Sequence, residues 1–296
     1  MQKTNYYVKG QRYIIPTSDW GFKKLFATEE NKGLLIGLLN RIIDGPPIDD
    51  LEYLDREVLI PTGTVRFDVY CKCSDGSRII VEMQKYARAN FIDRAIVYTA
   101  ASILDGFKIE AQHQYRINRT YLIAIIGENI FPYTSHAPVR LALCDIDDPG
   151  RPVLNDKVLQ IFIELPKFAE KVETLSPDAD FLSKFAVALK TMNMSPDRPD
   201  IMDDDMLIEL YKAADLHRLP ESEKKDYEKG IMNNLEYEIT LWEYKTEGRA
   251  EGKAEGRAEG RAEGIAETAA KMKAHGIPPE VIAECTGLDL NAIAEL

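Results

Sequence analysis

The 296-residue sequence predicts an α/β fold, a sheet flanked by helices, with a helical C-terminal extension. Three kinds of apolar spacing indicate it: helical periodicity marks amphipathic helices, alternation marks half-buried strands, and short unbroken apolar runs mark buried strands. The predicted elements are, in chain order, helices within 19–43, strands within 64–85, a helix at 90–107, and strands at 120–126 and 158–165. From residue 182 onward the pattern is mostly helical.

The charge of the chain is unevenly distributed. The sequence holds 37 Lys and Arg against 49 Asp and Glu, a net charge of -12, which argues against a surface that is basic throughout and grips nucleic acid everywhere. Residues 1–110 hold equal numbers of acidic and basic residues, so the whole excess lies in 111–296. A local basic groove therefore remains open, built from Lys23, Lys24, Lys85, Arg88 and Arg94.

The apolar runs are short. None approaches the roughly 20 apolar residues that a membrane-spanning helix needs, and the N-terminus has no apolar signal region. The four cysteines form neither a disulfide framework nor a CxxC metal pattern. We expect a soluble, cytoplasmic protein with no membrane partner.

The first predicted helical stretch begins after a capping signal. Asp19 precedes the apolar residues Phe22, Leu25 and Phe26, and its side chain is suited to an N-cap. The pattern continues to Ile43 and ends at Asp-Gly-Pro-Pro, so we expect one or two short amphipathic helices.

A β-hairpin is predicted next, and the length of its loop decides which side chains share a face. A two-residue loop, Asp75-Gly76, would put Asp68 and Glu82 on opposite faces of the sheet. A three-residue loop, with Gly76 in the left-handed conformation, pairs Cys73 with Ser77 and brings Asp68 opposite Glu82 on one face. We adopt the three-residue loop, with a continuous first strand from residue 64 to 73 whose polar face includes Tyr70.

The C-terminal part contains a low-complexity repeat. Residues 247–267 repeat Glu-Gly-Arg/Lys-Ala, and each of the five glycines costs a helix about 1 kcal/mol relative to Ala. The repeat is either a flexible linker or a helix whose Gly and Ala rows let a partner helix approach. We predict four parts: a nuclease-like domain at 1–172, a helical region at 173–246, the repeat at 247–268, and a small helix-turn-helix-like tail at 269–296.

The strongest chemical pattern is the carboxylate pair of the hairpin. Asp68 and Glu82 side by side repel each other unless something neutralises them, and a divalent cation does so. Mg²⁺ prefers oxygen ligands and would lower the pKa of an attacking water at a phosphodiester. Gln84 points to the same face as Glu82 and could hold that water. Spacing alone leaves open the plainer interpretation, a solvated hairpin face with scattered charge.

Several motifs together resemble the PD-(D/E)XK nuclease family of transposase-like proteins, the recombination-promoting nuclease group. The resemblance covers roughly residues 19–168, and a Glu-Gly-Arg-Ala tail is also typical of the group. The residues that carry it are Asp19 with Phe22-Lys23-Lys24-Leu25-Phe26, Phe67-Asp68-Val69, Val81-Glu82-Met83-Gln84, Arg94 with Tyr98, and Glu164-Leu165-Pro166-Lys167-Phe168.

The resemblance implies a restriction-endonuclease-like mixed sheet and a DNA endonuclease that depends on Mg²⁺ or another divalent cation such as Mn²⁺. It makes Asp68 and Glu82 metal ligands and places Gln84 where the superfamily motif has Lys. Because Gln carries no positive charge, that charge must come from elsewhere, and Lys85 and Arg94 are the candidates. Asp19 is a candidate further acidic residue.

The resemblance implies DNA as the partner, and Lys23, Lys24 and Arg88 are weak candidates for contacting it. The alternative is a catalytically inactive nuclease fold that acts as an oligomerising or DNA-associated interaction module. In either case the repeat tail is a candidate homo-oligomer contact. A third possibility, groove recognition by the last helix, is disfavoured because residues 286–296 contain no Lys or Arg.

Overall fold

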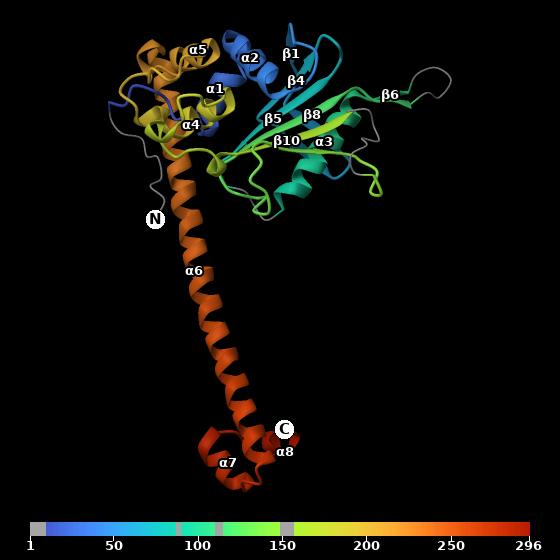
Figure 1. The fold of residues 1–296 in the computed structure, drawn as a ribbon, viewed down its shortest axis with the longest axis vertical. Helices are drawn as coiled ribbons and strands as arrows, with labels where there is room; N and C mark the ends of the chain where they lie inside the picture. The colour runs from blue at the N-terminus through green and yellow to red at the C-terminus, as the bar shows by residue number, and fades with distance from the viewer. Residues whose placement is uncertain (1–9, 87–89, 110–114, 149–156) are drawn as a thin grey trace. The chain divides into compact units, whose positions relative to one another are not determined.

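The computed structural model describes residues 10–86, 90–109, 115–148 and 157–296 (Figure 1). It divides into two compact units, Met1–Asn234 and Leu235–Leu296, which are described separately. Within the described residues, no helix is both long enough and apolar enough to cross a membrane. The domain boundary expected after residue 172 stays a prediction.

A mixed sheet organises the first unit, as predicted. Within the described residues it has six strands in the order β1-β4-β5-β8-β10-β9, of which β5, β8 and β10 are mutually parallel. The strands are β1 Leu51–Tyr53, β4 Val69–Cys73, β5 Arg78–Gln84, β8 Thr120–Ile126, β9 Val139–Ala142 and β10 Val158–Glu164. Two separate ribbons pair β2 Glu57–Ile60 with β3 Gly63–Arg66, and β6 Lys108–Ile109 with β7 Tyr115–Arg116.

The turn between β4 and β5 has the predicted three-residue loop. Gly76 has φ +82°, a left-handed conformation that Gly adopts readily, and the amide of Cys73 donates to the carbonyl of Ser77 at 2.9 Å. The ladder pairs Val69 with Val81, so the next position toward the open end sets Asp68 opposite Glu82. The loop length thus fixes the register that brings the two carboxylates together.

The prediction of one continuous strand from 64 to 73 was wrong. β3 ends at Arg66 and β4 begins at Val69, because Phe67 turns into the core and its amide donates to the carbonyl of Arg56 instead. Tyr70 is not on a polar face either, since helix α3 covers that face and leaves it 1% exposed. Because of this break, Asp68 lies outside β4, and its amide donates to the Glu82 side chain instead of to a strand partner.

Helices cover the sheet on both faces (Figure 1). One face shares a core with α1, α2, α4, α5 and the start of α6, and the other face packs against α3. Alternation along β5 sends Val81 and Met83 to the first core and Ile80 to the second. The helices of the first unit are α1 Asp19–Phe26, α2 Lys32–Ile42, α3 Phe91–Gly106, α4 Phe181–Thr191 and α5 Asp205–Ala213, and α6 Glu221–Ala274 starts there. The short 3-10 helices are Glu29–Asn31, Leu165–Lys167, Val172–Thr174, Met192–Met194 and Leu216–Arg218.

The N-cap of α1 is Ser18 and not the predicted Asp19. The Ser18 hydroxyl accepts from the amide of Gly21 at 3.1 Å, and Asp19 becomes the first helical residue. The helix is held close to the preceding segment, because a Cβ on Gly21 would lie 2.2 Å from the carbonyl oxygen of Ile15. The helix therefore has little freedom to shift.

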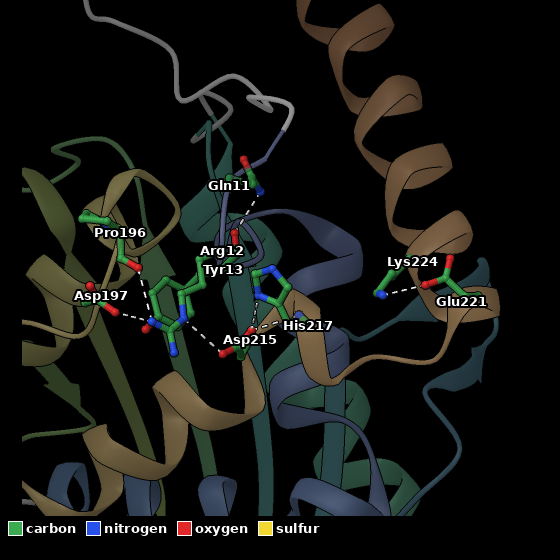
Figure 2. A network of polar contacts seen from close by, with 9 residues as sticks. All are labelled: Gln11, Arg12, Tyr13, Pro196, Asp197, Asp215, His217, Glu221 and Lys224. Carbon is green, nitrogen blue, oxygen red and sulfur yellow. Dashed lines mark hydrogen bonds and ion pairs between the residues drawn. The ribbon is translucent and has the colours of Figure 1, made fainter.

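The segment leading into α1 is anchored by a polar network (Figure 2). Tyr13 forms an isolated β-bridge with Asp215, and Arg12 Nε lies 3.2 Å from an Asp215 carboxylate oxygen. The other oxygen of that carboxylate accepts from the amide of His217 at 2.9 Å and lies 3.1 Å from its ring Nδ1. This network ties the chain after α5 to the start of α1.

The second unit is helical throughout its regular structure. The repeat lies within α6, so its backbone is helical rather than an irregular linker. Helices α7 Pro279–Thr286 and α8 Leu290–Glu295 follow, as the tail pattern predicted. Ala269, Ile282 and Ile293 form its small buried core.

Candidate active site

Two carboxylates meet at the open end of the β4–β5 hairpin. The amide of Asp68 donates to Glu82 Oε1 at 3.0 Å, and the amide of Met83 donates to Asp68 Oδ2 at 2.9 Å. The Glu82 carboxylate thus accepts a hydrogen bond from the backbone of Asp68, and the Asp68 carboxylate accepts one from the residue after Glu82. Because the register and the strand break fix both backbones, they also fix the two carboxylates.

Gln84 and Arg94 complete the inner side of the cluster. Gln84 Nε2 donates to Glu82 Oε2 at 3.3 Å, and Arg94 reaches the same oxygen at 3.2 Å and the Gln84 amide oxygen at 3.3 Å. The guanidinium of Arg94 lies over the ring of Tyr98, 4.8 Å from its centroid, and the Tyr98 hydroxyl donates to the carbonyl of Arg66. Helix α3 thereby delivers Arg94 to the carboxylates.

Helix α1 reaches the cluster from the other side. Lys23 Nζ lies 3.9 Å from Asp68 Oδ1 and 2.5 Å from Asp19 Oδ1, one helical turn away on the same face. From the sequence we predicted Asp19 as a further acidic residue of the site, and Lys23 only as a candidate contact with DNA. The i,i+4 spacing of the pair was visible in the sequence, but its approach to Asp68 was not.

The structure describes two of the other basic candidates, Lys24 and Lys85. Lys24 pairs with Glu30 at 3.0 Å and with Glu223 at 2.8 Å. The Lys85 ammonium lies 5.6 Å from the ring centroid of Tyr86. Arg88 falls in 87–89, outside the described residues.

The surroundings of Asp68 and Glu82 disfavour the ionised form of both carboxyl groups. Burial, followed by repulsion from Asp68, raises the pKa of Glu82 to about 8. Burial also raises the pKa of Asp68, with Asp19 adding to the increase, while the Met83 amide and the Lys23 ammonium oppose it. The side chain of Glu82 is only 2% exposed. A cation bound between the two carboxylates would favour the ionised form of both.

A family model described as PD-(D/E)XK nuclease family transposase matches residues 16–239, about three quarters of the chain. The chain belongs to this family. The matched region contains the carboxylate pair, Gln84, Arg94 and the Asp19–Lys23 pair. Comparisons with curated proteins and with solved structures gave no match.

The donor set of this PD-(D/E)XK protein fits a hard divalent cation. Asp68 and Glu82 offer carboxylate oxygens and no sulfur or imidazole, which suits Mg²⁺ or Mn²⁺ better than zinc. The described residues contain no group of three His, Cys, Asp or Glu placed to share an ion. Mg²⁺ commonly takes one or two carboxylates and completes its shell with water and substrate phosphate.

The raised pKa of Glu82 predicts how the metal-free PD-(D/E)XK protein responds to pH. The folded state binds this proton more tightly than the unfolded chain, where the pKa is ordinary, so the stabilisation is complete below about pH 4.5 and is lost as pH rises through about 8. The free energy of unfolding should therefore fall across this window, with a contribution of at most about 1.4 kcal/mol per pH unit.

Urea unfolding in EDTA between pH 5 and pH 8 measures this dependence. The matched variant is Glu82→Gln, which keeps the amide contact but does not titrate, and its stability should fall less steeply. Parallel curves for the two proteins would contradict the assignment of the proton to Glu82.

The remaining family motif is structural in this PD-(D/E)XK protein. Glu164 ends β10 and is fully buried, with Oε1 accepting from the amides of Ile130 and Phe131 at 2.6 and 2.8 Å. Its other oxygen forms an ion pair with Lys167, whose ammonium also donates to the carbonyl of Phe131 at 3.1 Å. These hydrogen bonds and this ion pair hold the loop after β8 against the end of β10.

Proposed function

We propose that this protein is a divalent-cation-dependent endodeoxyribonuclease resembling the recombination-promoting nucleases and transposases of mobile elements. The observation that carries the proposal is the convergence of Asp68 and Glu82 through reciprocal backbone contacts. A structural role gives no reason to bury two carboxylates against each other, because each disfavours the ionisation of the other. A cation shared between them removes that cost.

Each residue of the cluster has a proposed part in the hydrolysis. Asp68 and Glu82 would hold Mg²⁺ or Mn²⁺, which polarises the phosphodiester and acidifies the attacking water. The Gln84 amide orients that water, and Arg94 keeps Gln84 and Glu82 in place through its two contacts. The water oxygen bonds to phosphorus and the bond to the leaving sugar oxygen breaks. One water proton ends on the released hydroxyl and the other passes to solvent.

DNA is the proposed substrate, and a further copy of the chain is a proposed partner. The family membership supports DNA. The homo-oligomer rests on the repeat, where a Cβ added to Gly252, Gly256, Gly260 or Gly264 would meet no atom of the described residues within 4 Å. That side of the helix leaves room for another helix to approach.

Cleavage of supercoiled plasmid DNA with Mg²⁺ or Mn²⁺, with and without EDTA, tests the proposed activity. We expect nicked or linear product that EDTA abolishes, and no product from an Asp68→Asn/Glu82→Gln double variant. A structured RNA in parallel reactions distinguishes the two nucleic acids. Product from the double variant would assign the activity to a contaminant, and absence of product from the wild-type protein would favour the inactive interaction module.

A further inference from the structure

The candidate site has carboxylates and an amide where the superfamily motif also has a lysine. Gln84 occupies that position and can donate or accept hydrogen bonds, but it carries no charge. Phosphodiester hydrolysis develops negative charge on the phosphate oxygens, so a cation held nearby lowers the barrier. The question is which side chain of this protein provides it.

The basic residues near the site differ in which groups balance their positive charges. Both terminal nitrogens of Arg94 are engaged, one with the buried Glu82 carboxylate and one with Gln84, so its charge is balanced within the cluster. Lys24 is paired with two glutamates. Lys23 also lies near two carboxylates, Asp19 at 2.5 Å and Asp68 at 3.9 Å. It differs from Lys24 because Asp68 belongs to the candidate site, so the Lys23 ammonium lies beside the proposed metal ligands.

We propose that Lys23 supplies, from helix α1, the positive charge that Gln84 does not, by contacting a phosphate oxygen of the DNA beside Asp68. The inference rests on the proposed nuclease function. At 3.9 Å from Asp68 Oδ1, the ammonium is beyond hydrogen-bond distance of that carboxylate and close enough to share a ligand with it. Its three donors allow it to keep Asp19 and also bind phosphate.

Asp19 acts here as a positioning residue for Lys23. Its carboxylate lies 2.5 Å from the ammonium, one helical turn away, so it restrains the position of the lysine beside Asp68. Helix α1 is itself fixed by the burial of Phe22, Leu25 and Phe26 in the core. The lysine is therefore delivered by a rigid element, which favours a defined role over a loose surface contact.

A charge relocation tests the proposal. Lys23→Gln removes the cation from α1, and Lys23→Gln/Gln84→Lys restores one at the superfamily position. We expect the single variant to cleave DNA about a hundredfold more slowly under single-turnover conditions, and the double variant to recover at least about tenfold of that loss. Lys72→Gln, an exposed lysine on β4, is the matched control and should cleave at the wild-type rate.

A second readout, the affinity for Mn²⁺ measured by calorimetry without DNA, separates charge supply from support of the metal ligands. Lys23→Gln should bind Mn²⁺ as tightly as the wild-type protein or somewhat more tightly, because a cation beside Asp68 has been removed. Wild-type cleavage by Lys23→Gln, or a loss of Mn²⁺ affinity parallel to the loss of cleavage, would each overturn the role of Lys23 while leaving the nuclease assignment standing. An inactive wild-type protein would overturn both.

Discussion

Replacing Asp68 with Asn is expected to lower divalent-cation-dependent DNA cleavage by roughly a hundredfold to a thousandfold or more. Asn keeps an oxygen that can accept from the Met83 amide, so the local backbone contact survives. It loses the charge that would bind the cation beside Glu82. Single-turnover cleavage of a labelled duplex measures the effect.

The same substitution should stabilise the metal-free protein. Removing the Asp68 charge removes one cause of the raised pKa of Glu82, and we expect a gain of about 1 kcal/mol in unfolding free energy at pH 8 in EDTA. Activity and stability would thus change in opposite directions, which misfolding cannot produce. Glu52→Gln, an exposed carboxylate on β1, is the matched control and should change neither. A destabilised Asp68→Asn protein, or one that cleaves at the wild-type rate, would contradict the site.

Replacing Glu164 with Ala should destabilise the first unit by about 3–5 kcal/mol, because it leaves the Lys167 ammonium buried without its counter-charge. The amides of Ile130 and Phe131 also lose their acceptor. A loss of this size is a large fraction of the 5–15 kcal/mol that typically separates folded from unfolded domains. Urea denaturation followed by tryptophan fluorescence measures it.

Two further variants separate the charge from the hydrogen bonds of Glu164. Glu164→Gln keeps an acceptor for the two amides and should lose less stability than Glu164→Ala. Glu164→Leu/Lys167→Met removes both charges and should recover part of the loss, as replacing a whole buried pair usually costs less than breaking it. A loss below about 1 kcal/mol in Glu164→Ala would show that the pair does not hold the loop in place.

The sequence predicted those features that depend on local chemistry. The sequence offered two loop lengths for the hairpin, and the adopted three-residue loop, with Gly76 left-handed, is the one that sets Asp68 opposite Glu82. The apolar character of the chain predicted buried strands at 120–126 and 158–165, and the structure has them at Thr120–Ile126 and Val158–Glu164. Each of these signals is contained in one short stretch of the chain and reflects turn geometry or burial, which a single sequence displays.

Features that depend on how layers pack were missed. Nothing local marks the approach of Lys23 to Asp68, since it requires α1 to pack beside the start of β4, 45 positions away in sequence. The strand break came from the burial of Phe67, and the face that carries Tyr70 is not polar there because α3 covers it. Ser18 became the N-cap because Gly21 brings the helix start against Ile15.

The central claim is that Asp68 and Glu82 hold one divalent cation. Calorimetric titration of the metal-free, full-length protein with Mn²⁺ tests it most directly. The wild-type protein should bind Mn²⁺ with a stoichiometry near one at this site. The Asp68→Asn and Glu82→Gln variants should each bind at least about tenfold more weakly, and Glu52→Gln should match the wild type. Equal Mn²⁺ affinity in the wild-type protein and both site variants would contradict the account.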